Sequence, residues 1–158
     1  MFVPNDPRFD EILQLAQDAT GPGLKGTSRM RWRELANALL GQQLRDSTGS
    51  ERRRHLRAAA SLDLHLLAPE VLAGLVTSTI GPGGFSLRLA QASELPMGTI
   101  LEVSIAVAER PMPLLLKASV VWVRGDLVGA AFIDAFVNDR ELLEGIAVKA
   151  LLARAALE

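Results

Sequence analysis

The sequence predicts a mainly β protein, a six-stranded antiparallel β-barrel with a helical N-terminal extension and one C-terminal helix. Apolar residues recur with a helical period in the first 50 residues, alternate with a period of 2 between about 57 and 135, and return to a helical period afterwards. Turns rich in Gly and Pro separate the short alternating segments. We therefore divide the chain into the extension, residues 1–50, and the barrel with its C-terminal helix, residues 51–158.

Two helices are expected in the extension. The first is short and presents Ile12, Leu15 and Ala16 on one face, and the second runs from about Ser28 to Leu44 around Trp32. Ser28 suits the N-cap of the second helix. The segment GPGLKG at 21–26 separates them. It contains the GxGxxG spacing of nucleotide loops, but it follows a helix rather than a strand, so we interpret it as a connector.

Six strands are expected in the middle of the chain, because each segment places its apolar residues on one face. An antiparallel barrel suits short strands of this kind, since closure leaves no exposed sheet edge. The Trp at position 122 is expected in the core. The expected strands are 60–66, 71–78, 85–89, 99–107, 114–123 and 128–133.

The last helix is expected to begin at Asn138, which forms a capping-box pattern with Glu141. Its apolar stripe is wider than packing on one end of a barrel requires, since Val148 and Leu152 extend the stripe around Leu142. Two explanations remain open. The helix is more deeply buried than a simple end cap, or it also packs on a second subunit in a homodimer.

Composition excludes several classes of function. The 158 residues contain no cysteine, which excludes disulfide scaffolds, thiol catalysis and cysteine-ligated metals. The two histidines have no partners in a recognisable catalytic or metal-binding pattern, so we expect neither an enzyme nor a metal site. The start of the chain lacks the apolar core of a signal peptide, and no apolar stretch is long enough to span a bilayer. We expect a soluble, cytoplasmic protein without membrane insertion.

Positive charge is concentrated in one segment. The whole chain has a formal net charge of −1, yet residues 25–57 carry nine basic and three acidic side chains, a local charge of +6. Arginine forks suit phosphates and the edges of guanine, although a charge run is also typical of a solvated linker. No aromatic residue alternates with the dense arginines at 51–57, which disfavours binding of single-stranded nucleic acid.

A series of segments after this basic run resembles the PilZ domain family. The segments are RRRHLR at 52–57, TIGPGGFSLRL at 79–89, LPMGTILEVSI at 95–105 and ASVVWVRGDLVGAAFID at 118–134. The resemblance covers about residues 52–150. It implies a split six-stranded barrel with a terminal helix, and many members of this bacterial family bind cyclic di-GMP.

The resemblance implies a set of ligand-binding residues. Arg53 and Arg57, with Arg54, match the RxxxR element of family members that bind the ligand, where these arginines contact phosphates and stack on guanine. Thr79, Gly81 and Gly84 align with the second element, [DN]xSxxG. Thr79 stands where Asp or Asn is expected and Gly81 where Ser is expected. The loss of two hydrogen bonds would cost about 2–4 kcal/mol.

Three functions fit the sequence. The first expectation is a regulatory adaptor that acts through an unidentified protein partner in motility, polarity or secretion, with weak or lost cyclic di-GMP binding. The alternative is a functional receptor, in which the Arg53–Arg57 loop closes on cyclic di-GMP and switches a partner surface. A nucleic-acid-binding barrel is a third and weaker alternative. No cofactor is expected, and cyclic di-GMP is the candidate ligand.

Overall fold

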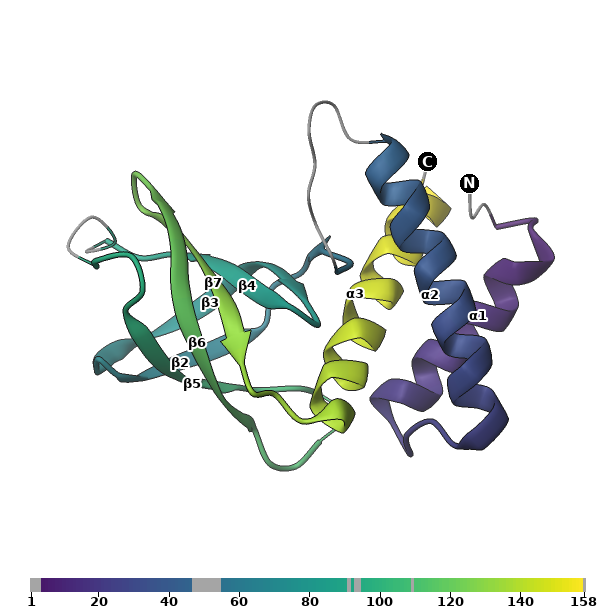
Figure 1. Cartoon of the computed structure of the whole chain (residues 1–158), viewed down its shortest axis with the longest axis horizontal. Helices are drawn as coiled ribbons and strands as arrows, with labels where there is room; N and C mark the ends of the chain where they lie inside the picture. The colour runs from purple at the N-terminus through teal and green to yellow at the C-terminus, as the bar shows by residue number, and fades with distance from the viewer. Residues whose placement is uncertain (1–3, 47–54, 91, 93–94, 109, 158) are drawn as a thin grey trace.

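The computed structural model describes all residues except 1–3, 47–54, 91, 93–94, 109 and 158. A β-barrel and a group of three helices form the molecule, and the C-terminal helix lies between the barrel and the two N-terminal helices (Figure 1). In chain order the elements are α1 (Pro7–Thr20), α2 (Gly26–Asp46), β1 (Ala58–Ala59), β2 (Asp63–Ala68), β3 (Val71–Gly81), β4 (Gly84–Arg88), β5 (Ile100–Ile105), β6 (Leu114–Arg124), β7 (Leu127–Ile133) and α3 (Val137–Leu157).

The barrel is closed and antiparallel, as the sequence predicts. Its strands follow the order β3-β2-β5-β6-β7-β4, and the pairing of β4 with β3 closes the circle. The two-residue strand β1 is an addition, paired with β3 through Ala58 opposite Ile80 and Ala59 opposite Thr79. The strand expected over 60–66 therefore begins later, since β2 starts at Asp63 and residues 60–62 connect it to β1.

The interior of the barrel is filled by the inward residues of the alternating strands. In β2, for example, Leu64 and Leu66 are buried while Asp63 and His65 are exposed. Leu142 and Leu143 of α3 join the same core from one end of the barrel. Burial of this kind supplies most of the favourable free energy of folding, at roughly 25 cal/mol for each Å² of apolar surface.

The N-terminal helices form a second core with the far side of α3. Trp32 of α2 is fully buried there, as expected, together with Ile12 and Ala16 of α1. Val148 and Leu152 of α3 belong to this core rather than to the barrel core. The wide apolar stripe of α3 is therefore covered on two sides within one chain, which supports the deeper-burial explanation of its breadth.

Neither of the two residues expected as N-caps, Ser28 and Asn138, is an N-cap, because both helices begin earlier. The connector after α1 is a loop, as predicted, but α2 already begins at Gly26, so Ser28 lies in its first turn. Helix α3 begins at Val137, one residue before Asn138, and the carbonyl of Phe136 accepts the N–H of Arg140. Glu141 is used elsewhere, in an ion pair with Arg29 of α2.

Among the described residues, no helix combines the length and the apolar character that crossing a bilayer requires.

Candidate functional site

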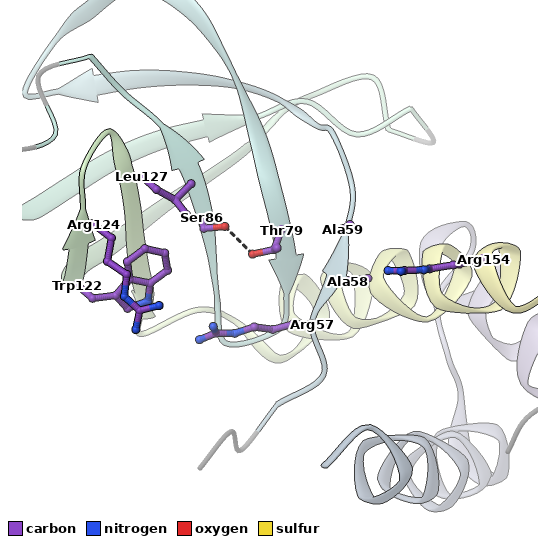
Figure 2. A pocket seen from close by; sticks show the side chains of 9 residues that line it. All are labelled: Arg57, Ala58, Ala59, Thr79, Ser86, Trp122, Arg124, Leu127 and Arg154. Atoms are coloured by element: carbon purple, nitrogen blue, oxygen red, sulfur yellow. Dashed lines mark hydrogen bonds between the residues drawn. The ribbon is translucent and has the colours of Figure 1, made fainter. Parts of the chain in front are cut away.

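A cavity of about 500 Å³ opens beside β1, where β3 and β4 approach β6, β7 and the end of α3 (Figure 2). One residue of each predicted binding element, Arg57 and Thr79, lines this cavity. Its lining residues come from five strands, from the residue before β1 and from α3. They are Arg57, Ala58, Ala59, Thr79, Ser86, Trp122, Arg124, Leu127 and Arg154.

Arg57 is the member of the predicted arginine element that the structure places in this cavity. It directly precedes β1, whose pairing with β3 fixes the backbone beside it. Its side chain is exposed and extends toward Trp122 and Arg124 (Figure 2). Arg53 and Arg54 lie outside the described residues, so their part of the prediction has no structural counterpart here.

Thr79 of β3 also lines the cavity, and it has a partner that the sequence analysis missed. Its Oγ1 lies 2.7 Å from Oγ of Ser86, which is directly opposite it on β4 (Figure 2). Ser86 is buried, with 5% of its surface exposed. The alternating pattern of residues 85–89 identifies Ser86 as a polar position of the strand. Only the strand register shows that Ser86 lies opposite Thr79.

Gly81 and Gly84 are the two predicted residues that do not line the cavity. A Cβ atom on Gly81 would lie 2.0 Å from the carbonyl oxygen of Leu56, and one on Gly84 would lie 2.1 Å from that of Ala130. Distances this short are impossible for real side chains. Sterics therefore explain why position 81 holds glycine rather than the serine of the family pattern. Without a side chain here, the segment before β1 can pass directly over β3.

Trp122 is half-buried and lines the cavity, so its expected place in the core is wrong. The Cζ atom of Arg124 lies 5.1 Å from the centroid of its ring, within the range of a cation–π contact. Gly129 faces Trp122 across the strand pair, and a Cβ there would lie 2.0 Å from the ring. The missing side chain of Gly129 thus lets the indole lie against β7 and support Arg124 at the cavity.

The cavity is strongly positive. Arg57, Arg124 and Arg154 bring three guanidinium groups to it from three different parts of the chain, and none of the lining residues that the structure describes is acidic. The sequence analysis singled out only the first of these. Arg124 and Arg154 lie far from the basic segment, so composition gave no reason to associate them with it. This arrangement suits a ligand with at least two negative charges.

The arginines of α2 have a different role from Arg57. Arg29 pairs with Glu141 at 2.8 Å, Arg31 pairs with Glu11, and Arg33 pairs with Glu144. The Arg31 guanidinium lowers the pKa of the Glu11 carboxyl, and the Glu141 carboxylate raises the pKa of Arg29. These ion pairs join α2 to α1 and α3, so this part of the basic segment is neutralised within the fold.

The described part of the chain contains no group of three or more His, Asp or Glu side chains that could hold a metal ion. The chemistry available at the cavity is therefore that of guanidinium groups, two hydroxyls and one indole ring. Guanidinium groups suit the binding of an anion through charge-assisted hydrogen bonds. Among the described lining residues there is no nucleophile–base pair of the kind that covalent catalysis uses.

Comparisons with known proteins agree with this geometry. The model of the PilZ domain family matches residues 51–148. The fold is similar to the Bacillus subtilis inhibitor of motility MotI/DgrA, with a TM-score of 0.57 and 20% sequence identity over 66% of this chain and 53% of that one. It is also similar to the PilZ domain of YcgR from Escherichia coli, solved with c-di-GMP, with a TM-score of 0.52 and 14% identity over 66% of this chain and 95% of that one.

These likenesses differ in what they establish. The match covers about half the length of MotI/DgrA, and both structural identities are low, so the two structures show the fold alone. No curated protein matches the chain. The family match, in contrast, spans the whole barrel and the first part of α3. The chain therefore belongs to the PilZ domain family.

Proposed function

We propose that this protein is a non-enzymatic cyclic di-GMP receptor of the cytoplasm that regulates a protein partner. The observation that carries the proposal is the cavity of about 500 Å³ with Arg57, Arg124 and Arg154 around it. Cyclic di-GMP carries two phosphodiester charges, and guanidinium groups bind phosphates with charge-assisted hydrogen bonds. We therefore favour the receptor over the first expectation from the sequence, an adaptor with weak or lost cyclic di-GMP binding.

The lining residues divide into two roles in this proposal. Arg57 and Arg154 lie on different sides of β1 (Figure 2) and would contact the phosphates, and the planar guanidinium of Arg57 would also stack on a guanine base. Arg124 is supported on Trp122 and would add a third contact. The hydroxyls of Thr79 and Ser86 lie deeper between β3 and β4 and would accept hydrogen bonds from the N–H groups of guanine.

Ser86 changes the expected affinity. The resemblance to the family predicts the loss of two hydrogen bonds, one because Thr79 replaces Asp or Asn and one because Gly81 replaces Ser. The hydroxyl of Ser86 in the cavity wall compensates for one of them. The remaining loss is about 1.5 kcal/mol, or roughly tenfold in affinity relative to a site with the usual residues.

We propose that the receptor acts by changing its contact with a protein partner. The similar structure MotI/DgrA, described as an inhibitor of motility, supports an output connected with motility, and the YcgR domain, described with c-di-GMP, supports the choice of ligand. In this proposal the ligand orders the arginine side chains around the cavity and so changes the surface that the partner contacts. The helices α1 and α2, packed against α3, would form part of that surface.

The second candidate is an adaptor that works without ligand. The substitution of Thr79 and Gly81 for the usual residues of the second binding element favours it, because both changes remove groups that recognise guanine. Under this alternative the positive cavity is retained only as part of a protein-binding surface.

Calorimetric titration with cyclic di-GMP tests the proposal. We expect the wild-type protein to bind, Arg57→Ala and Arg154→Ala to weaken binding roughly 10- to 100-fold, and Arg140→Ala to have no effect. Arg140 is a matched control because it is an exposed arginine of α3 that does not line the cavity. Cyclic di-AMP carries the same phosphates and is expected to bind more weakly. A wild-type protein that shows no binding would leave only the second candidate.

A further inference from the structure

One side chain of α2 holds the backbone of the residue that carries the cavity arginine. The side-chain Nε2 of Gln43 donates to the carbonyl oxygen of Arg57 at 2.7 Å, and the N–H of Arg57 donates to Oε1 of Gln43 at 3.2 Å. Both polar backbone groups of Arg57 are therefore satisfied by one amide. This amide lies three residues before the end of α2, a helix that lies outside the barrel.

The neighbouring residue is held from the same side. Leu56 is 1% exposed and packs in the core formed by the helices, together with Trp32, Leu35 and Leu39 of α2. Its carbonyl passes directly over Gly81 of the barrel. The backbone at Leu56 and Arg57 thus lies between the helical core and β3, and contacts with both fix its path.

We propose that Gln43 is a positioning residue for cyclic di-GMP binding. Through Arg57, Gln43 couples the docking of the N-terminal helices to the affinity of the cavity for this ligand. Gln43 does not line the cavity, so it acts through Arg57. The inference rests on the proposed function, because it concerns the ligand of the same site. It adds a residue and an element that the family's binding pattern, carried by RxxxR and the second element, does not include.

The physical reason is the cost of ordering an arginine. A bound arginine loses the freedom of its side chain, and a mobile backbone beneath it adds a further loss of entropy on binding. The two hydrogen bonds from Gln43 and the burial of Leu56 fix that backbone before the ligand arrives. The coupling is reciprocal. If docking of the helices raises the affinity for the ligand by a given factor, bound ligand raises the equilibrium constant for helix docking by the same factor.

The first test compares ligand affinity in three variants by calorimetry. Gln43→Ala removes both hydrogen bonds and is expected to weaken cyclic di-GMP binding about tenfold. Gln43→Glu keeps an acceptor for the Arg57 N–H but loses the donor to its carbonyl, and it is expected to fall between Gln43→Ala and wild type. Gln17→Ala is the matched control, an exposed glutamine on α1, and is expected to bind like wild type.

The second test separates positioning from general loss of structure. Hydrogen exchange of the Arg57 amide, followed by NMR without ligand, is expected to be about tenfold faster in Gln43→Ala and unchanged in Gln17→Ala. Cyclic di-GMP is expected to slow exchange in α2 of the wild-type protein and to do so less in Gln43→Ala. Thermal unfolding followed by circular dichroism is expected to show all variants folded at the temperature of the titration.

Two results would overturn the inference about Gln43 while leaving the proposed function intact. Gln43→Ala that binds cyclic di-GMP as tightly as wild type would show that Gln43 does not position Arg57 for the ligand. An Arg57 amide that exchanges at the same rate in Gln43→Ala and wild type would show that the hydrogen bonds do not fix the backbone. A wild-type protein that does not bind at all would instead overturn the proposed function, and the ligand coupling with it.

Discussion

Gly81 lies where the segment before β1 crosses β3, and it illustrates how one missing side chain shapes the site. The family pattern has serine at the aligned position, yet a Cβ here would lie 2.0 Å from the carbonyl oxygen of Leu56. A serine could be accommodated only if the backbone at Leu56 moved away. Because Arg57 directly follows Leu56, that movement would also shift the backbone of the cavity arginine, so the two parts of the binding pattern are sterically linked.

We predict that Gly81→Ser destabilises the protein by about 1–3 kcal/mol and does not improve cyclic di-GMP binding. Urea unfolding and calorimetry measure the two effects. Gly74→Ser is a matched control on the same strand, because a Cβ there meets nothing within 4 Å and is expected to change stability by less than about 0.5 kcal/mol. Tighter binding by Gly81→Ser would show that the crossing segment yields without cost.

Most groups at the cavity became recognisable only from tertiary structure. Arg57 and Thr79 were identified from sequence, because the family pattern carries them at fixed spacing. Ser86 reaches the cavity through its register opposite Thr79, and Arg154 reaches it through the packing of α3 against the barrel. Register and helix placement depend on contacts between distant segments, so a local pattern contains no information on either.

Helix α3 is the element that joins the two cores. Its first turns bury Leu142 and Leu143 in the barrel, and its later turns bury Val148 and Leu152 against α1 and α2. Between these faces lies Glu144, which is 5% exposed and accepts a hydrogen bond of 2.7 Å from Nε1 of Trp32. Arg33 of α2 pairs with the same carboxylate. A buried carboxylate with two donors therefore ties α2 to α3.

Removal of this carboxylate is expected to be costly. Glu144→Ala leaves the indole N–H of Trp32 buried without its acceptor, and we predict a loss of about 2 kcal/mol in the free energy of unfolding, measured by urea denaturation. Glu144→Gln keeps an acceptor and is expected to lose less. Glu34→Ala is the control, since Glu34 forms an exposed ion pair with Arg31 and is expected to cost less than about 1 kcal/mol. Equal losses in the two alanine variants would contradict this role of Glu144.

The elements themselves could largely be predicted from local periodicity. All three helices and the six barrel strands lie near their expected positions, because amphipathic patterns of period 3.6 and 2 are properties of short segments. The exceptions have physical reasons. Strand β1 has two residues, too few for a period, and the starts of α2 and α3 precede Ser28 and Asn138, which local capping preferences alone do not determine.

At the scale of the whole molecule, the shared helix makes the barrel and the N-terminal helices interdependent. The division of the chain into residues 1–50 and 51–158 remains our prediction for its modules, but neither core is complete without α3. Helix α1 docks mainly on α3, α2 is joined to α3 by the side chains of Arg29, Trp32 and Arg33, and Gln43 adds a polar link to the segment beside the barrel. Separation of the two parts would expose apolar residues of α3 to water.

We therefore predict that the two cores unfold in one cooperative transition. The chain has two tryptophans, with Trp32 in the helical core and Trp122 at the barrel cavity. Trp122→Phe leaves a fluorescent reporter in the helices, and Trp32→Phe leaves one in the barrel. In each variant the urea midpoint by fluorescence is expected to coincide with the midpoint by far-ultraviolet circular dichroism. Fluorescence and dichroism midpoints that separate would indicate that the two cores unfold independently.

The tight crossing over β3 has a consequence for how this chain can evolve. A single mutation that returned serine to position 81 would meet the Leu56 carbonyl, so such a mutant would be selected against unless the crossing backbone had shifted beforehand. That shift would break the hydrogen bonds from Gln43. Homologues that carry serine at the position of Gly81 are therefore expected to differ at the residue equivalent to Gln43 as well, and the two positions should covary across lineages.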